Sequence, residues 1–159
     1  MNPCPCGYLG SATHHCRCTP DQIHRYQAKL SGPLMDRIDL HVEVPSLPHV
    51  DLLGAPAGES TDSIRQRCTA SRQRALDRQG CTNMALQGQA IDQHILLDAD
   101  AVKFLNVAAT RLGWSARGTH RALKVARTIA DLAGAPATQV SHVAEAMQYR
   151  RALRSAPAL

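Results

Sequence analysis

Aromatic residues and long apolar runs are both scarce in this chain of 159 residues. Aromatics make up 3% of the sequence and all hydrophobic residues 44%, so a core must be built from Ala, Leu, Val and Ile, which suits packed helices better than a β-sandwich. No apolar run reaches the roughly 18 residues of a membrane-spanning helix, and the N-terminus lacks the basic-then-apolar pattern of a signal peptide. We therefore expect one cytoplasmic domain, with or without an appendage, and no membrane partner.

Lysine is also rare, so arginine carries most of the positive charge. Lys29, Lys103 and Lys124 are the lysines among 18 Lys and Arg residues, and the formal net charge is +5. None of the three follows a glycine, so the sequence contains no Gly-x-x-x-x-Gly-Lys-Ser/Thr phosphate-binding loop. Arginine favours bidentate contacts to phosphate, which indicates a nucleotide or a nucleic acid as partner. A general Ala and Arg bias in composition is the alternative.

Four of the six cysteines are clustered near the N-terminus. Cys4 and Cys6 form one C-x-C pair, and Cys16 and Cys18 form a second. Two such pairs joined by a compact loop can place four thiolates around Zn²⁺, although C-x-C is tighter than the C-x-x-C spacing usual in zinc knuckles. One of the two histidines between the pairs is an alternative fourth ligand. Free thiols or adventitious disulfides are the alternatives to a metal site.

Residues 38–44 alternate apolar and polar side chains, the pattern of a half-buried β-strand that ends at Pro45. One strand cannot bury its own face, and no second convincing strand occurs in the sequence. We therefore expect residues 1–50 to be an extended, poorly ordered stub apart from the cysteine loop, with the partner strands outside this sequence. Residues 51–60, rich in Pro, Gly, Ala and Ser, are predicted to be a linker.

The rest of the chain has helical periodicity. Ser60 or Thr61, Asp98 and Ser115 are predicted N-caps, and residues 88–96 are expected to add one or two further turns. Helices with short connections predict an all-α fold, a small four-helix bundle. The predicted helices span 61–79, 98–112, 115–134 and 138–154. Their predicted inward residues are Ile64, Cys68, Ser71, Ala75; Val102, Leu105, Ala108, Ala109, Leu112; Ala122, Val125, Ala126, Ile129, Leu132, Ala133; and Val140, Val143, Ala144, Met147.

Two of these helices carry basic faces. Residues 61–79 combine a thin apolar face with many arginines, so this helix is either a solvated charged helix or one that faces nucleic acid. Cys68 and Cys81 are expected to be small buried or half-buried side chains. The arginines of the first helix are Arg65, Arg67, Arg72, Arg74 and Arg78, and the basic stripe of the third predicted helix is Arg117, Arg121, Lys124 and Thr128.

The first turn of the helix after Ser115 contains two locally unfavourable residues. Arg117 puts a cation at the positive end of the helix dipole, and Gly118 costs about 1 kcal/mol relative to Ala inside a helix. Both are explained if an anion docks there, because free amides and a guanidinium would converge on a phosphate that Gly118 lets approach. A solvated surface arginine in an imperfect helix is the alternative.

Four segments are distinctive when taken together: residues 1–8 (MNPCPCGY), Cys16-Arg17-Cys18, residues 30–40 (LSGPLMDRIDL) and residues 124–132 (KVARTIADL). They resemble the C-terminal portion of the magnesium-chelatase-like AAA+ ATPases, and the resemblance covers nearly the whole chain. It implies a hexameric ATP-driven motor that acts on DNA, with branch migration in competence as its process. The implied partners are therefore DNA and other subunits of the same protein, and the implied cofactors are ATP and Mg²⁺ in the parent protein.

The resemblance also implies roles for individual residues. Asn2 is similar to the sensor-1 residue, which orients the water that attacks the γ-phosphate. Arg37 resembles the arginine finger, which stabilises transition-state charge at the neighbouring subunit's nucleotide. Arg117 resembles sensor 2, which lies on the helical lid and distinguishes ATP from ADP, and Arg121 on the same basic face is the second candidate nucleotide-binding residue.

The chain departs from the family pattern in lacking the phosphate-binding loop (Walker A), the acidic strand end that holds Mg²⁺ (Walker B) and everything N-terminal to sensor 1. We therefore expect a fragment, monomeric in isolation, that does not hydrolyse ATP alone. Its expected parts are a core remnant at 1–50, a linker at 51–60, a helical lid at 61–154 and a tail at 155–159.

Two rival interpretations are open. One is a stand-alone zinc-dependent DNA-binding helical module without ATPase activity, which would use the cysteine loop and the basic helix at 61–79. The other is a structural interaction domain, in which neither Arg37 nor Arg117 contacts a phosphate.

Overall fold

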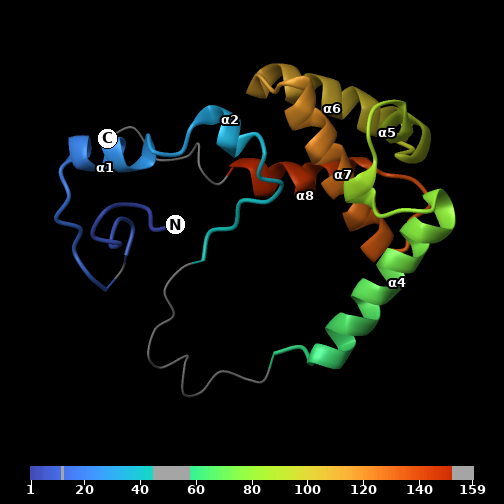
Figure 1. Cartoon of the computed structure of the whole chain (residues 1–159), viewed down its shortest axis with the longest axis horizontal. Coiled ribbons are helices and arrows are strands. Elements are labelled where there is room, and N and C mark those ends of the chain that lie inside the picture. The colour runs from blue at the N-terminus through green and yellow to red at the C-terminus, as the bar shows by residue number, and fades with distance from the viewer. Residues whose placement is uncertain (12, 45–57, 152–159) are drawn as a thin grey trace. The chain divides into compact units, whose positions relative to one another are not determined.

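The computed structural model describes residues 1–11, 13–44 and 58–151, which form two compact units (Figure 1). The N-terminal unit contains Met1–Ile38 together with residues 43 and 44. The helical unit contains Asp39–Val42 and residues 58–151. Most of the expected linker and all of the expected tail lie outside the described residues.

The helical unit is all-α, as the periodicity predicted. Its long helices are α4, α6, α7 and α8, and the short elements η1 and α5 connect α4 to α6. Helix α7 packs against α8, α4, α5 and η1, while α6 packs against α8. The bounds are α4 Thr61–Gln79, η1 Asn83–Ala85, α5 Gln89–His94, α6 Ala99–Leu112, α7 Ala116–Leu132 and α8 Val140–Arg151.

The predicted N-caps start the helices. The side chains of Ser60, Asp98 and Ser115 each accept a hydrogen bond from the backbone N–H three residues later, which satisfies one unpaired amide of the first turn. Gly80 and Gly113 end α4 and α6 with φ of +72° and +60°, a conformation that glycine adopts without steric cost.

Helix α8 starts later than predicted. Thr138 does not cap it, because Thr138 lies in a short parallel bridge with Leu97 and is fully buried. Its N–H donates to the carbonyl of Leu96 at 2.7 Å. The first turn of α8 is instead closed by His142, whose Nδ1 accepts the Gln139 N–H at 3.0 Å.

The core of the helical unit is aliphatic, as the shortage of aromatics requires. Phe104 and Trp114 pack against its edge, half-buried. The predicted inward faces are correct in part: Val102, Leu132 and Ala133 are exposed, and Ala101 is buried in place of Val102. The buried core residues are Leu86, Ile91, Ile95, Ala101, Leu105, Ala108, Leu123, Ala126, Val143, Ala146 and Met147.

The first half of α4 is exposed, which corrects two further expectations. Cys68 is exposed rather than buried, and Ile64 keeps 42% of its surface accessible. Burial on α4 begins at Ser71 and Ala75, and Cys81 is half-buried as expected. No helix in the described part of the chain is both long and apolar enough to cross a bilayer.

The N-terminal unit contains two helices that hydrophobic periodicity did not predict, α1 (Pro20–Gln27) and α2 (Gly32–Met35). The start of α1 has a complete capping box: Thr19 Oγ1 accepts the Gln22 N–H, and Gln22 Oε1 accepts the Thr19 N–H at 3.0 Å. Pro20 then occupies the first helical position, where a missing N–H costs nothing.

The strand predicted at 38–44 is not formed: these residues pair with no strand in the described part of the chain. Residues 39–42 instead contact the helices of the helical unit, of which they form part. Asp39 forms an ion pair with Arg121 of α7, and the His41 N–H donates to the carbonyl of Tyr149 in α8 at 2.7 Å. Alternating apolar residues are present, but a strand needs a neighbouring strand to satisfy its backbone.

Candidate functional site

Arg117 lies in the first turn of α7 with its side chain exposed. Its neighbour Gly118 is buried, and the Gly118 N–H is already used by the cap, donating to Ser115 Oγ at 3.0 Å. Among the described residues Arg117 has no hydrogen-bond or ion-pair partner. The guanidinium is therefore available to an external group at the positive end of the helix dipole.

The surroundings of Gly118 leave room for a Cβ atom. A Cβ atom built on Gly118 would lie 3.4 Å from Ser115 Oγ and 3.5 Å from Nη2 of Arg150 in α8. The guanidinium of Arg150 also lies over the Trp114 ring, 5.7 Å from its centroid. These are ordinary contact distances, so packing against α8 does not by itself require glycine at position 118.

The other two arginines of α7 are engaged. Arg121, half-buried, pairs with Asp39 at 2.5 Å. Arg127 is 1% exposed and pairs with Asp131 one turn later at 2.7 Å. Arg117 is therefore the arginine of this helix that is left without an acidic partner in the described part of the chain.

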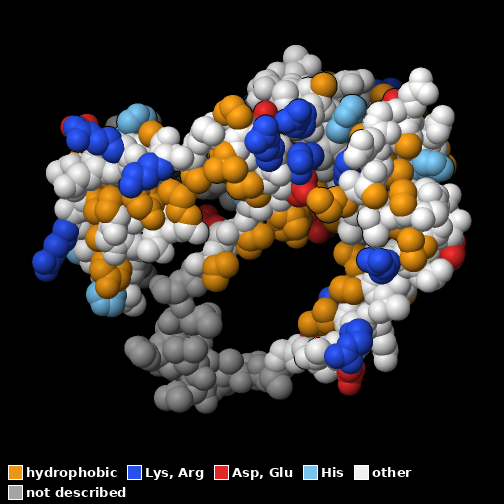
Figure 2. All heavy atoms as spheres, in the orientation of Figure 1, with side chains coloured by type: hydrophobic (Ala, Val, Ile, Leu, Met, Phe, Trp, Pro, Cys, Tyr) orange, Lys and Arg blue, Asp and Glu red, His pale blue; other side chains and the backbone are white. Residues whose placement is uncertain are grey.

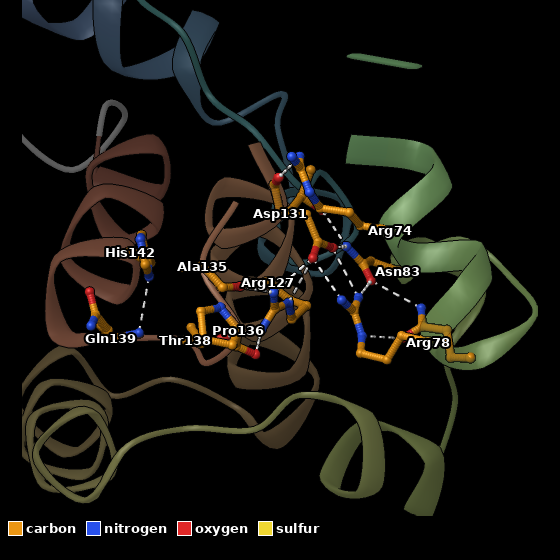
Figure 3. A network of polar contacts seen from close by, with 12 residues as sticks. Arg74, Arg78, Asn83, Arg127, Asp131, Ala135, Pro136, Thr138, Gln139 and His142 are labelled. Atoms are coloured by element: carbon orange, nitrogen blue, oxygen red, sulfur yellow. Dashed lines mark hydrogen bonds and ion pairs between the residues drawn. The ribbon is translucent and has the colours of Figure 1, made fainter. Parts of the chain in front are cut away.

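Asp131 is the centre of a buried polar network that joins three segments of the helical unit (Figure 3). Its carboxylate accepts two hydrogen bonds from Arg78 of α4, at 2.7 and 2.9 Å, and one from Asn83 of η1 at 2.8 Å. Arg127 adds two more at 2.7 and 3.1 Å, and also donates to the carbonyls of Ala135 and Pro136. The network fastens α4 and the loop before α8 to the end of α7.

The carboxyl group of Asp131 is fully buried. Burial alone would raise its pKa, but hydrogen bonds from Arg78, Arg127 and Asn83 outweigh burial and lower the pKa below its ordinary value. The sequence signal was the Arg127-to-Asp131 spacing of four residues, which places both side chains on one helix face. That spacing indicates contact, but not burial.

The network also changes the interpretation of the basic helix. Arg78 binds Asp131, and Arg74 donates to the Asp131 carbonyl at 2.7 Å, so both hold α4 on α7. Farther toward the start of α4, Arg65 pairs with Asp62. Figure 2 shows basic side chains along α4 at the surface. In the described part of this helix, Arg72 is the arginine with no such contact.

The other two predicted nucleotide residues, Asn2 and Arg37, lie in the N-terminal unit. Both side chains are exposed. Asn2 lies beside Gly7, where an added Cβ would be 3.5 Å from its Nδ2 atom. Arg37 follows α2, and its N–H donates to the carbonyl of Leu34 at 3.0 Å. The four candidate nucleotide residues are thus divided equally between the two units.

The structure brings the four clustered cysteines together. Their sulfur atoms lie within 4.8 Å of one another, as a group of potential metal ligands. The Cys4–Cys6, Cys6–Cys16 and Cys4–Cys16 sulfur distances are 3.4, 3.6 and 3.7 Å. Neither histidine of the loop joins the group: His14 stacks on Tyr8 and bonds to Thr13 instead.

The thiols of this cluster have different acidities. A hydrogen bond from the Tyr8 backbone N–H stabilises the Cys6 thiolate and lowers its pKa to about 6. The Cys6 backbone N–H acts in the same direction on Cys18, but burial and the neighbouring thiols outweigh it and raise the pKa of Cys18 to about 12. At Cys16 a hydrogen bond from the Cys18 backbone N–H lowers the pKa, but burial and the thiols of Cys6 and Cys4 outweigh it, so the pKa of Cys16 is also raised.

Comparison with known proteins gives two family matches that together cover most of the chain. Residues 58–150 match the family described as magnesium chelatase, subunit ChlI C-terminal. Residues 1–52 match the family described as magnesium chelatase, subunit ChlI.

Similar curated proteins are all longer than this chain. The chain is 41% identical to competence protein ComM of Haemophilus influenzae over 155 residues, covering 97% of this chain and 30% of ComM. It is 41% identical to YifB of Salmonella typhimurium over 152 residues, and 36% identical to Rv2897c of Mycobacterium tuberculosis over 154 residues; each covers 94% of this chain. The chain thus spans about three tenths of the length of these relatives.

Proposed function

Because the chain belongs to the magnesium chelatase ChlI family, we propose that it is the helical lid and subunit-interface part of an AAA+ ATP-dependent DNA motor. In this proposal the full-length protein is a hexamer that binds ATP and Mg²⁺ through a phosphate-binding loop absent from these 159 residues. The similarity to competence protein ComM of Haemophilus influenzae supports competence as the process in which this motor acts.

The exposure of Arg117 is the observation that supports a nucleotide-sensing lid. Arg121 and Arg127 of the same helix pair with Asp39 and Asp131, whereas Arg117 has no acidic partner among the described residues. A cation at a helix N-terminus is unfavourable by a few tenths of a kcal/mol. A phosphate docked there would make the electrostatic free energy favourable, because both the guanidinium and the first-turn amides would then face an anion.

Arg37 and Asn2 complete the proposal in the N-terminal unit. Arg37 is an exposed guanidinium and so is free to reach a phosphate on a neighbouring subunit, as an arginine finger does. Asn2 is exposed beside the cysteine cluster, where its amide can orient a water molecule. In this role the helical unit reports the nucleotide state, and the N-terminal unit couples it to the next subunit.

The test is ATP turnover by full-length protein that carries the phosphate-binding loop. Arg117→Ala is expected to lower kcat by about 10²-fold, the loss typical for one preorganised charged donor. Arg37→Ala is expected to lower it by about 10³-fold or more, the lower bound for an arginine finger. The matched control is Arg72→Ala, which removes an exposed arginine without a partner from α4.

Unchanged turnover in Arg117→Ala would contradict the sensor role and favour the structural interaction domain. Equal losses in Arg117→Ala and Arg72→Ala would indicate a general charge effect. A mixture of Arg37→Ala subunits with subunits disabled in the phosphate-binding loop separates the finger from a residue that acts within its own subunit, because a finger restores activity only across an interface.

A stand-alone zinc-dependent DNA-binding module is the second candidate function, and the cysteine cluster favours it. The basic helix favours it less, since Arg74 and Arg78 hold α4 on α7. This candidate predicts that the isolated chain binds DNA with a log–log salt slope of several and loses that affinity when a chelator is added. The lid proposal predicts weak binding that a chelator does not change.

A further inference from the structure

The N-terminal unit lacks a hydrophobic core. Among its described residues the buried side chain is Cys4, and every other residue is half-buried or exposed. A folded unit of about 40 residues normally needs a disulfide, a metal ion or another molecule to offset the entropy of ordering its chain. The described cysteines are all free thiols, so a disulfide is not the stabilising element here.

The sulfur geometry fits one metal ion. A tetrahedral centre with zinc–sulfur bonds of about 2.3 Å has sulfur–sulfur edges of about 3.8 Å. The edges among the Cys4, Cys6 and Cys16 sulfur atoms, 3.4, 3.6 and 3.7 Å, are close to this value and far from the roughly 2.05 Å of a disulfide bond. The Cys18 sulfur lies within 4.8 Å of the other three. Four converging thiols with no carboxylate in the group suit a soft, tetrahedral ion.

The backbone around the sulfur atoms provides the outer support that metal sites require. The Gly7 N–H donates to the Cys4 carbonyl at 3.1 Å, and φ of +84° at Gly7 turns the chain tightly around the first pair. The backbone N–H groups of Tyr8 and Arg17 donate to the Cys6 sulfur. Backbone donors of this kind orient the sulfur ligands of a metal ion and offset their negative charge.

The surroundings of the cluster have the charge that such a centre needs. Four thiolates around a divalent cation carry a formal charge of −2. A shallow hollow beside Cys6 and Cys18 is lined by Arg17, Arg25 and Lys29, and no Asp or Glu is among the described residues that line it. These three cations lie where they would offset the excess negative charge.

We propose that Cys4, Cys6, Cys16 and Cys18 bind one Zn²⁺ ion, and that this ion is the structural centre of the N-terminal unit. The ion joins the first cysteine pair to the residues directly before Thr19, the cap of α1. The far end of α1 is held to the same loop, since Gln27 Nε2 donates to the Pro3 carbonyl at 3.1 Å. Zinc therefore fixes α1 on the loop that carries Asn2.

Metal analysis of the whole chain tests this directly. Protein purified under reducing conditions without a chelator is expected to contain one zinc ion per chain, and Cys68→Ser, which removes an exposed cysteine of α4, is expected to retain it. Cys4→Ser and Cys16→Ser are expected to lose at least nine tenths of the zinc. Replacement by Co²⁺ is expected to produce the thiolate-to-metal absorption of a tetrahedral centre, absent from Cys4→Ser.

The structural role has its own readout, amide exchange with and without a chelator. Zinc removal is expected to abolish protection across α1 and leave α7 protected, because the helical unit has its own core. Protection of the α7 amides in Cys4→Ser also shows that the helical unit of this variant is folded. The zinc site is overturned if the wild-type chain binds no zinc after refolding with Zn²⁺, if it binds iron instead, or if Cys4→Ser and Cys68→Ser contain the same amount of zinc. The structural role is overturned if the amides of α1 remain protected after the metal is removed.

Discussion

Replacing Asp131 by Asn is expected to cost the helical unit about 3–5 kcal/mol of unfolding free energy. The substitution preserves the shape of the side chain and removes its charge. Asp131 is fully buried, and Arg127, which it neutralises, is 1% exposed. The variant therefore leaves a buried guanidinium without its counter-charge, and one nitrogen donor of the new amide faces the donors of Arg78 and Asn83.

This magnitude is large because the pair is buried. Two guanidiniums and an amide supply five hydrogen bonds to the Asp131 carboxylate, and breaking a buried pair by removing one partner is far costlier than the net stability of the intact pair. A domain of this size is stable by about 5–15 kcal/mol in total. The variant should consequently be marginally folded or unfolded at physiological temperature.

Urea unfolding of the whole chain, followed by far-ultraviolet circular dichroism, measures the effect. Asp62→Asn is the matched control, because Asp62 forms the same kind of ion pair with Arg65 while its side chain is 79% exposed. The control should lose no more than about 1 kcal/mol, since exposed pairs contribute little.

The pH dependence provides a second check on Asp131. Because the pKa of Asp131 is lowered in the folded protein, the unfolded chain takes up the proton first as the pH falls. The carboxylate thus stabilises the fold above its ordinary pKa of 3.8, and this stability is lost as the pH falls through the lowered value. Asp131→Asn should lack this acid-dependent component. A loss below 1 kcal/mol, or one equal to that of Asp62→Asn, would refute the buried network.

Two further outcomes follow from the helical unit. Burial, with a smaller contribution from Arg150, lowers the pKa of His41 below its ordinary value of 6.5. The neutral imidazole therefore contributes stability above pH 6.5, and this stability is lost as the pH falls through the lowered pKa. Urea titrations at several pH values should show this loss, and His41→Phe should abolish it. Ser115→Ala should lower the free energy of unfolding by about 1 kcal/mol because it removes the N-cap of α7. Ser141→Ala, on the exposed face of α8, should change it by less than about 0.5 kcal/mol. Equal effects of the two substitutions would contradict the role of Ser115 as a cap.

Local chemistry made the starts of α4, α6 and α7 predictable. Ser60, Asp98 and Ser115 cap helices in the structure because a short side-chain oxygen can reach an unpaired amide three residues ahead, whatever lies farther away. The same locality made the cysteine pairs visible, since two C-x-C spacings indicate that two sulfur atoms can turn toward one point. The clustering of all four sulfur atoms then depended only on a short loop.

Other predictions failed where the outcome depends on distant residues. Alternation at residues 38–44 indicated a strand, but a strand forms only beside another, and Asp39 and His41 instead bind α7 and α8. Val102 has the spacing of a buried residue, yet 41% of its surface is exposed. The capping box of α1 is visible in Thr19 and Gln22, but none of the eight helical residues is buried, so the helix has no core-facing apolar stripe for periodicity to indicate.

Sequence alone determined the class of this protein: its helices and their caps, its aliphatic core, its thiol pairs and its resemblance to the magnesium chelatase family. Only the tertiary structure decided which arginines of α7 are available. The spacing of four residues indicates the contact between Arg127 and Asp131, but nothing local distinguishes Arg117 from Arg121. Asp39 neutralises Arg121 from 82 residues away, and Asp131 neutralises Arg127 from four residues away. Arg117 stays exposed. The pairing of Arg121 depends on a contact with a residue far away in the sequence, which no local pattern indicates.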